Sequence, residues 1–287
     1  MGLNAGIVVV DKPEGLTSFG VVRRVRRILR VKKAGHTGTL DPIATGVLVV
    51  CVGKATRVIE YLDTKKEYVA RIHLGITTDT GDSAGRIIKT VDVPDITREE
   101  LEHLLEEEFT GEIEQIPPAF SAVKIQGERA YKLAREGKDV CLSPRKVFVH
   151  SLKLEEFSLP YITVRAVVDR GTYMRSLARD IGEAIGCGGC VSFLRRVRDS
   201  GFSIGDAVTL EEMEQGDYTV FPISRALAHL PVVQLNPEEL SRFVRGETVL
   251  VGKFSSVGPV RVEDGTGEVM GIGVPRDGGL GPKKVFV

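Results

Sequence analysis

Residues 35–46 read Gly-His-Thr-Gly-Thr-Leu-Asp-Pro-Ile-Ala-Thr-Gly, a string with three glycines, three threonines, one histidine and one carboxylate. Glycine adopts backbone angles and permits close approaches that other residues do not, so the string predicts a loop. The proline after Asp41 disfavours helical geometry at the aspartate and places it at a bend. From composition alone, a turn with an Asp-Pro corner and a loop that presents a reactive carboxylate are equally good interpretations.

Rigid elements are predicted on both sides of this loop. Residues 47–52, Val-Leu-Val-Val-Cys-Val, predict a buried strand, because they are continuous, apolar and rich in β-branched side chains. Residues 6–13 predict a second buried strand that stops at its proline. Between them, Ser18 suits the cap of a helix through residues 21–30, whose apolar side chains form one stripe and whose arginines face the other way.

The string that begins at residue 35 resembles the signature of the bacterial tRNA pseudouridine-55 (TruB) family of pseudouridine synthases. The match is long and ungapped, and the family's nucleophilic aspartate falls on Asp41. The resemblance implies that His36 helps to fill the space left by a flipped-out nucleotide, and that Thr39 has a supporting role. The pair Lys12-Pro13 matches a family motif beside the active site, so both are also assigned supporting roles.

Two further blocks carry the same resemblance. Lys66-Glu67-Tyr68 fits a family pattern whose tyrosine stacks on the target uracil, and residues 171–175, Gly-Thr-Tyr-Met-Arg, fit a second one. The resemblance pairs Arg175 with the catalytic aspartate, packs Tyr173 near the bound base and places Leu194 at the uracil pocket. Chemistry supports the pairing, because a guanidinium favours the ionised, nucleophilic form of a carboxylate that is secluded from water. Without the resemblance, Tyr68 reads as a core aromatic.

Charge is unevenly distributed along the chain. Thirty-nine basic and thirty-nine acidic residues cancel, but residues 23–33 hold seven cations and no acid, whereas residues 92–114 hold ten acids and one arginine. We expect the helical face with Arg23, Arg26 and Arg27 to contact RNA phosphates, and a merely solvated cationic face is the alternative. By resemblance, Lys124 and Arg129 belong to a segment that closes over an RNA stem-loop.

The sequence predicts neither a metal site nor a cofactor. Its four cysteines include one Cys-x-x-Cys, at 187–190, without the second pair that zinc would need, so we interpret them as ordinary thiols. Asp79 and Asp82 stand among small residues at 77–85 and fall short of a calcium ligand set, so we interpret this segment as a structured turn.

Regular elements are predicted along the rest of the chain. Alternating segments at 67–74, 146–154 and 161–168 predict strands. A short helix is predicted at 56–62, another at 128–136, and an acidic amphipathic helix that opens with a capping box at Thr97. A length of 287 residues and a hydrophobic content of 42% support a sizeable core and more than one structural unit.

The resemblance implies an α+β class, with the pseudouridine synthase fold over residues 1–229. We expect a mixed, mainly antiparallel central sheet flanked by helices, and an inserted RNA-clamping segment at about 92–145. Short strands broken by glycine over residues 230–287 predict a small C-terminal β-barrel, which resembles the PUA-type RNA-binding domain.

The expected reaction is isomerisation of uridine to pseudouridine, at position 55 in the T-arm of tRNA, after the nucleotide is flipped out of its stem-loop. We expect a monomer without an obligate protein partner. No apolar run has membrane-spanning length and the first residues lack a secretory n-region, which favours the cytoplasm. The alternatives are a guide-RNA-dependent synthase of the H/ACA type and a non-catalytic tRNA-binding or tRNA-folding module.

Overall fold

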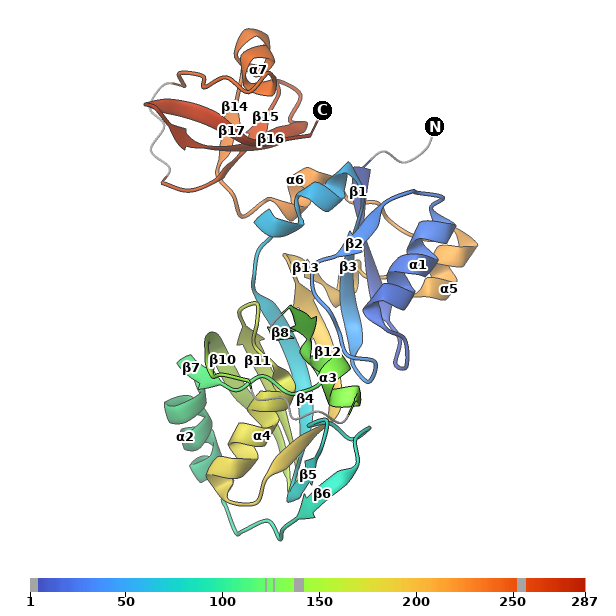
Figure 1. Ribbon diagram of the computed structural model, residues 1–287, viewed down its shortest axis with the longest axis vertical. Coiled ribbons are helices and arrows are strands. Elements are labelled where there is room, and N and C mark those ends of the chain that lie inside the picture. Colours follow the sequence, from blue (N-terminus) through green and yellow to red (C-terminus); the bar gives the residue numbers. More distant parts are fainter. Residues whose placement is uncertain (1–4, 122, 126, 137–141, 252–256, 287) are drawn as a thin grey trace.

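The structure is a computed structural model that describes residues 5–121, 123–125, 127–136, 142–251 and 257–286 (Figure 1). One large mixed sheet runs through the longer part of the molecule, and a smaller unit formed by the C-terminal residues lies at one end. The predicted α+β class, with a mixed and mainly antiparallel central sheet, is confirmed.

The large sheet has nine strands, seven of them in the order β1-β3-β12-β4-β11-β10-β7, with β2 beside β3 and β13 beside β12. Every pair is antiparallel except β3 with β12. The strands are β1 (Ala5–Lys12), β2 (Ala34–His36), β3 (Thr45–Gly53), β4 (Lys66–Leu74), β7 (Gly111–Gln115), β10 (Arg145–Ser158), β11 (Tyr161–Val168), β12 (Gly189–Asp199) and β13 (Phe202–Ser203).

The parallel contact between β3 and β12 divides this sheet into two parts. It consists of two residue pairs, Thr45 with Arg195 and Gly46 with Arg196. Farther along, β2 pairs with β3 through residues 50–52. We call the β3–β12 contact the seam, because β1, β2 and β3 lie on one side of it and the five strands from β12 to β7 lie on the other.

Most predicted strands are confirmed, with two differences. The strand predicted at 146–154 continues to Ser158, because its last residues still pair with β11. β12 is central in the sheet, although its segment does not predict a strand. It carries several arginines, which are unusual in a buried strand unless they are paired.

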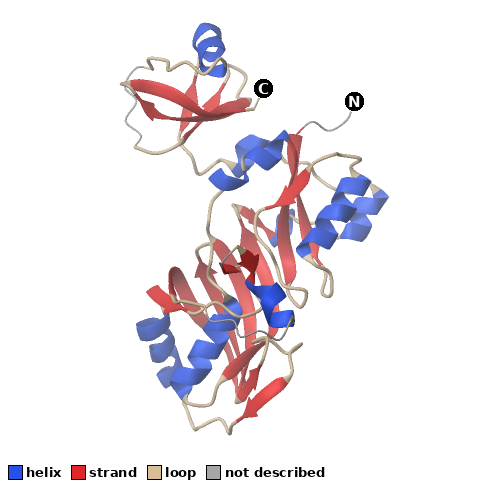
Figure 2. Cartoon of the chain, viewed as in Figure 1, coloured by secondary structure: helices blue, strands red, loops and turns tan. Residues whose placement is uncertain are grey.

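Helices pack on both parts of the sheet (Figure 2). α2 (Arg98–Phe109) contacts β10, and α4 (Met174–Ile185) contacts β12. On the other part, α1 (Ser18–Ile28) contacts β3, α5 (Leu210–Gln215) contacts β1, and the two helices contact each other. The capping box predicted at Thr97 is present. The predicted cap of α1 is wrong by one residue, because Thr17 accepts the hydrogen bond from the Gly20 amide and Ser18 is buried against the loop.

Shorter elements connect these parts. Two 3-10 turns, η1 (Lys54–Arg57) and η2 (Ile59–Tyr61), take the place of the single helix predicted at 56–62. The helix predicted at 128–136 starts two residues later, because residues 128–129 pair as a strand. The other short elements are β5 (Ile76–Thr78), β6 (Ile87–Thr90), β8 (Lys124–Ile125), β9 (Glu128–Arg129), α3 (Ala130–Arg135), η3 (Ile204–Asp206) and α6 (Ile223–Ala226).

The C-terminal unit is a four-stranded sheet with one helix, α7 (Pro237–Val244). Its strands, in spatial order, are β14 (Val232–Gln234), β15 (Val260–Glu263), β16 (Val269–Arg276) and β17 (Gly279–Val285). Val249 makes an isolated bridge with Leu280 of β17. Val269, Ile272 and Phe286 share a buried cluster with residues of β1 and β3, so apolar contacts join this unit to the large sheet.

Candidate active site

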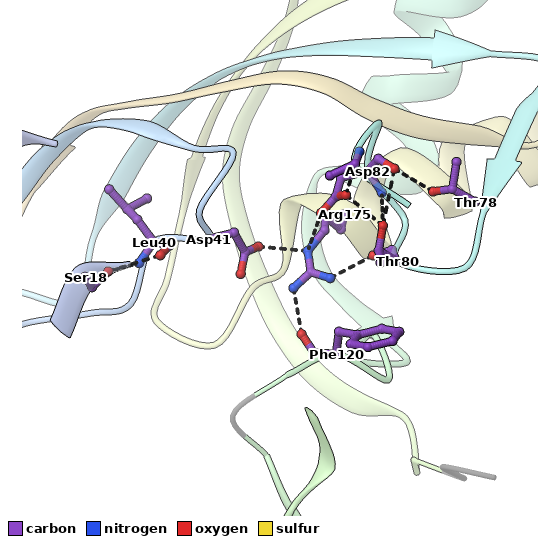
Figure 3. Close-up of polar contacts among 9 residues, drawn as sticks. Ser18, Leu40, Asp41, Thr78, Thr80, Asp82, Phe120 and Arg175 are labelled. Carbon is purple, nitrogen blue, oxygen red and sulfur yellow. Dashed lines mark hydrogen bonds and ion pairs between the residues drawn. The ribbon is translucent and has the colours of Figure 1, made fainter. Parts of the chain in front are cut away.

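Asp41 lies on the loop between β2 and β3, as predicted (Figure 3). Its carbonyl oxygen accepts a hydrogen bond from the Ala44 amide at 3.0 Å, which closes the bend after Pro42. The preceding residue, Leu40, is fixed by the buried Ser18 hydroxyl, which accepts from the Leu40 amide at 2.8 Å and donates to its carbonyl at 3.1 Å. The Asp41 side chain is 33% exposed, so its carboxylate is held at a defined place but is still accessible.

Lys12 braces the other end of the same bend. Its Nζ donates to the carbonyl oxygens of Pro13 at 2.8 Å, Leu16 at 2.7 Å and Pro42 at 3.3 Å. Burial lowers the pKa of Lys12 to about 8, and the nearby Asp41 carboxylate opposes that shift. These contacts fit the predicted supporting role, whereas Pro13 itself is exposed.

Arg175 comes from the first turn of α4 and meets Asp41 from the other side of the seam (Figure 3). Its Nε donates to Asp41 Oδ2 at 2.8 Å, which confirms the predicted pairing across 134 residues of sequence. Its Nη1 donates to the Thr80 carbonyl at 2.7 Å and its Nη2 to the Phe120 carbonyl at 2.9 Å. With 4% of the side chain exposed and all three nitrogens bonded, the guanidinium has one fixed orientation.

Asp82 belongs to this group of charges, although the sequence alone does not assign it to the site. Its Oδ2 lies 3.9 Å from Arg175 Nε. Its Oδ1 accepts from the Thr80 hydroxyl at 2.7 Å and from the Ala84 amide at 3.1 Å, so the turn between β5 and β6 holds it in place. The structured turn predicted at 77–85 is present. The presence of a second acid in that segment is the sequence feature that could have pointed to a role for Asp82.

Tyr68 and Leu194 lie in the same buried cluster as Leu40 and Ala44 of the loop. Tyr68 projects from β4, and burial raises the pKa of its phenol. Arg196 Nη1 donates to the Tyr68 hydroxyl at 3.5 Å. A phenol with a raised pKa is a poor general base at neutral pH, so the position of Tyr68 favours packing over proton transfer.

The remaining predicted site residues lie within the loop or at the start of α4. His36 ends β2 and is half-buried, and its Nδ1 has no hydrogen-bond partner among the described residues. Burial lowers the pKa of His36, and the positive charges of Arg196 and Lys66 lower it further. Thr39 is exposed. Tyr173 precedes α4, and its backbone is held by Gln115, whose side chain donates to the Tyr173 carbonyl at 3.2 Å and accepts from its amide at 3.0 Å.

The arginines predicted to contact RNA phosphates are exposed on α1. Arg23 and Arg26 face solvent, and the Arg23 guanidinium lies 5.9 Å from the centre of the exposed Phe19 ring. Arg27 is also exposed but forms an ion pair with Glu214 of α5 at 3.6 Å. The side chains of Lys124 and Arg129 lie outside the described part of the structure, so their predicted contacts stay predictions.

Neither a metal centre nor a membrane span is found in the residues that the structure describes. No group of three or more His, Cys, Asp or Glu side chains in them is arranged to hold a metal ion. None of the helices within the described ranges is long and apolar enough to cross a membrane.

Three family descriptions match consecutive parts of the chain. "TruB family pseudouridylate synthase (N terminal domain)" matches residues 26–174, "tRNA pseudouridylate synthase B C-terminal domain" matches 175–221, and "Pseudouridine synthase II TruB, C-terminal" matches 231–286. Among curated relatives, tRNA pseudouridine synthase B of Clostridium kluyveri is 39% identical over 98% of this chain and 99% of its own length. The protein of that name from Synechococcus sp. is 43% identical over 98% and 97%.

Solved structures give a consistent result. The chain is similar to one in a Cbf5-Nop10-Gar1 complex, with 28% identity and a TM-score of 0.77 over 100% of this chain and 86% of the other. A chain of the archaeal box H/ACA sRNP Nop10-Cbf5 complex gives 26% identity and a TM-score of 0.74 over 100% and 87%. From these matches along nearly the whole sequence, the chain belongs to the TruB family of pseudouridylate synthases.

Proposed function

We propose that this protein isomerises uridine to pseudouridine in tRNA, at position 55 of the T-arm. The observation that carries the proposal is the contact of Asp41 with Arg175, at 2.8 Å, in a chain whose full-length relatives are named tRNA pseudouridine synthase B. The reaction breaks the bond from ribose C1′ to uracil N1 and forms one from C1′ to C5. C5 gives up its proton and N1 gains one, so the composition of the nucleotide is unchanged and no co-reactant is consumed.

The target base first has to leave the RNA stack. A base inside a folded stem-loop hides its glycosidic bond, so the nucleotide is extruded into a protein pocket and the unstacking cost is offset by stacking and phosphate contacts. In this proposal Tyr68 stacks on the uracil, and Tyr173 and Leu194 line its pocket. His36, whose pKa is lowered by burial in the RNA-free protein, occupies the vacated space.

Asp41 is the proposed nucleophile, at uracil C6 or at ribose C1′. Arg175 contacts only its Oδ2, and among the described residues no side chain donates to Oδ1, so that oxygen keeps its lone pairs for the substrate. The guanidinium orients the carboxylate through this bond, and Asp82 and the two backbone carbonyls keep the guanidinium in place.

The rest of the chain is proposed to bind the RNA. We assign the synthase domain to residues 1–229, its RNA-contacting insertion to about 92–145 and a PUA-like RNA-binding domain to 230–287. The exposed cations on α1 support a phosphate-binding surface on that helix. This surface lies next to the Asp41 loop, because Ser18 in the first turn of α1 bonds to Leu40 of the loop.

A guide-RNA-dependent activity is the second candidate, because two of the similar solved structures are Cbf5 complexes, one of them an archaeal box H/ACA sRNP complex. The relatives named tRNA pseudouridine synthase B are more similar, at 39% and 43% identity, and they favour direct recognition of tRNA by a protein that needs no obligate partner.

The test is to incubate the purified protein with an unmodified tRNA transcript, without guide RNA, and to map pseudouridine at single-nucleotide resolution. We expect product at position 55 from the wild type and none from Asp41→Asn, which should still bind tRNA within a few-fold. Product that appears only after a guide RNA and partner proteins are added would favour the second candidate, and product from Asp41→Asn would refute the nucleophile.

A further inference from the structure

The seam separates the groups that the proposed reaction has to bring together. Asp41 is carried by the loop on the β1–β3 side, whereas Tyr68, Arg175 and Leu194 come from the other side. Backbone pairing across the seam involves only two residue pairs. Other groups must therefore fix the distance between the nucleophile loop and the tyrosine, because Tyr68 is proposed to hold the uracil that Asp41 attacks, and a misplacement of about 1 Å between attacking and attacked groups can cost roughly 100-fold in rate.

Arg196 spans the seam from a position with no solvent exposure. On the loop side, its Nη2 donates to the Gly38 carbonyl at 3.1 Å and its Nε donates to the Val47 carbonyl at 2.8 Å. On the other side, its Nη1 donates to the Tyr68 hydroxyl at 3.5 Å. One planar group thus contacts the backbone three residues before the nucleophile, the strand after it and the proposed stacking tyrosine.

Asp199 sets the orientation of that guanidinium and is also fully buried. Its Oδ2 lies 3.1 Å from Arg196 Nη2 and accepts the Thr37 hydroxyl at 2.7 Å. Its Oδ1 accepts the Ser200 hydroxyl at 3.0 Å and lies 3.9 Å from Lys66 Nζ. Buried ions are costly unless they are paired and hydrogen-bonded, so this group of contacts tolerates few alternative arrangements.

Two glycines allow the loop to approach this closely. A Cβ on Gly46 would lie 2.2 Å from the Arg196 carbonyl oxygen, and one on Gly38 would lie 2.1 Å from Lys66 Nζ. Real Cβ atoms are not found at such distances from other atoms, so both positions leave room for the contacts across the seam.

We propose that Arg196, oriented by Asp199, is a positioning residue that holds the Asp41 loop and Tyr68 in register across the seam. The expected effect of Arg196 on the reaction rate rests on the proposed function. The anchoring of the loop by Arg196 does not depend on that function. Arg196 does not touch the reacting atoms in this scheme. It sets the geometry in which Asp41 attacks, so its loss should slow the chemical step rather than weaken tRNA binding.

The test compares Arg196→Lys and Thr37→Val with the wild type. Lysine keeps a cation beside Asp199 but cannot reach Gly38, Val47 and Tyr68 together. Thr37→Val leaves the ion pair and the Arg196–Gly38 bond intact and removes only the bond from the Thr37 hydroxyl to Asp199, so it stays informative if the first variant fails to fold. Arg198→Lys is the matched control, because Arg198 is on the same strand, 62% exposed, with Glu67 at 3.7 Å.

Three quantities are measured: the single-turnover rate constant at saturating tRNA, the Kd for tRNA, and amide hydrogen exchange in peptides that cover residues 34–42. A misplacement of about 1 Å can cost roughly 100-fold, so we expect Arg196→Lys to lose between about 10- and 100-fold in rate with Kd within about threefold. Thr37→Val should lose less, both should exchange faster over residues 34–42, and Arg198→Lys should match the wild type.

Several results would overturn the proposal. It is wrong if Arg196→Lys and Thr37→Val keep the wild-type rate constant, if their defect is entirely in Kd, or if exchange over residues 34–42 is unchanged. A wild-type protein that forms no pseudouridine would refute the proposed function instead. The exchange measurement would then still decide whether Arg196 and Thr37 anchor the loop.

Discussion

Replacing Arg175 tests the central contact of the site. The variant Arg175→Met keeps most of the aliphatic volume but removes the guanidinium, and with it the 2.8 Å bond to Asp41 Oδ2. A hydrogen bond to a charged group contributes about 1.5–3 kcal/mol. If that contribution is realised in the transition state, the rate constant should fall by roughly 10- to 150-fold, since about 1.4 kcal/mol corresponds to a factor of ten.

The same substitution also has a cost in stability. The carbonyl oxygens of Thr80 and Phe120 each lose a donor. A buried acceptor left without a partner costs about 1–3 kcal/mol, and both contacts are only partly buried, so the cost should lie toward the lower end of that range. Arg175→Lys should be intermediate in both respects, because one ammonium cannot serve three acceptors placed around a planar group.

The assay is single-turnover pseudouridine formation at saturating tRNA, with unfolding in urea followed in parallel. Arg179→Lys is the control, because Arg179 lies one turn later on α4, is 27% exposed and bonds to Asp180 and the Ile116 carbonyl. If Arg175→Lys or Arg175→Met reacts at the wild-type rate, Arg175 does not support the nucleophile and the reasoning fails.

Three other predictions concern stability and RNA binding. Ser18→Ala should lower the free energy of unfolding by about 1–3 kcal/mol, since both backbone groups of Leu40 lose their partner, and a urea titration checks this. Burial lowers the pKa of Lys12 from 10.5 to about 8, so above pH 8 the unfolded chain binds more protons than the folded one and stability from this residue increases between pH about 8 and 10.5. Lys12→Met should reduce the slope of urea midpoint against pH in that range, and the remaining slope is expected from Lys66, whose pKa burial also lowers to about 8. Replacing Arg23 and Arg26 with glutamine should reduce the slope of log affinity against log salt by about 0.7–0.9 for each phosphate contact that is lost. An unchanged slope would show that this helix face is only solvated and does not contact the RNA.

Local sequence patterns are sufficient for the loop and most of the regular elements. The continuous apolar run after Gly46 and the alternation in β4 and β11 depend on neighbours in sequence, so they can be predicted directly. The capping box at Thr97 is likewise a local signal. The contact between Asp41 and Arg175 follows from the family resemblance, because no local pattern relates residues 134 positions apart.

What the sequence does not predict depends on tertiary contacts. β12 escapes prediction because Arg196 and Asp199 look like surface residues until their mutual pairing is known. Asp82 can be interpreted only as a turn residue, since its distance from Arg175 is set by the packing of α4 against the sheet. A serine at the start of a helix usually caps it, but the hydroxyl of Ser18 bonds to Leu40 instead.

The carbonyl oxygen of Phe120 makes the segment before β8 part of the support of the nucleophile, because Arg175 donates to it at 2.9 Å. Deleting or shortening that segment would therefore change two things at once: the RNA contacts proposed for it and the set of acceptors around the arginine. A truncation there that lowers turnover is not evidence of weaker tRNA binding alone. Point substitutions that leave the backbone path at residue 120 intact are the cleaner way to separate recognition from chemistry in this enzyme family.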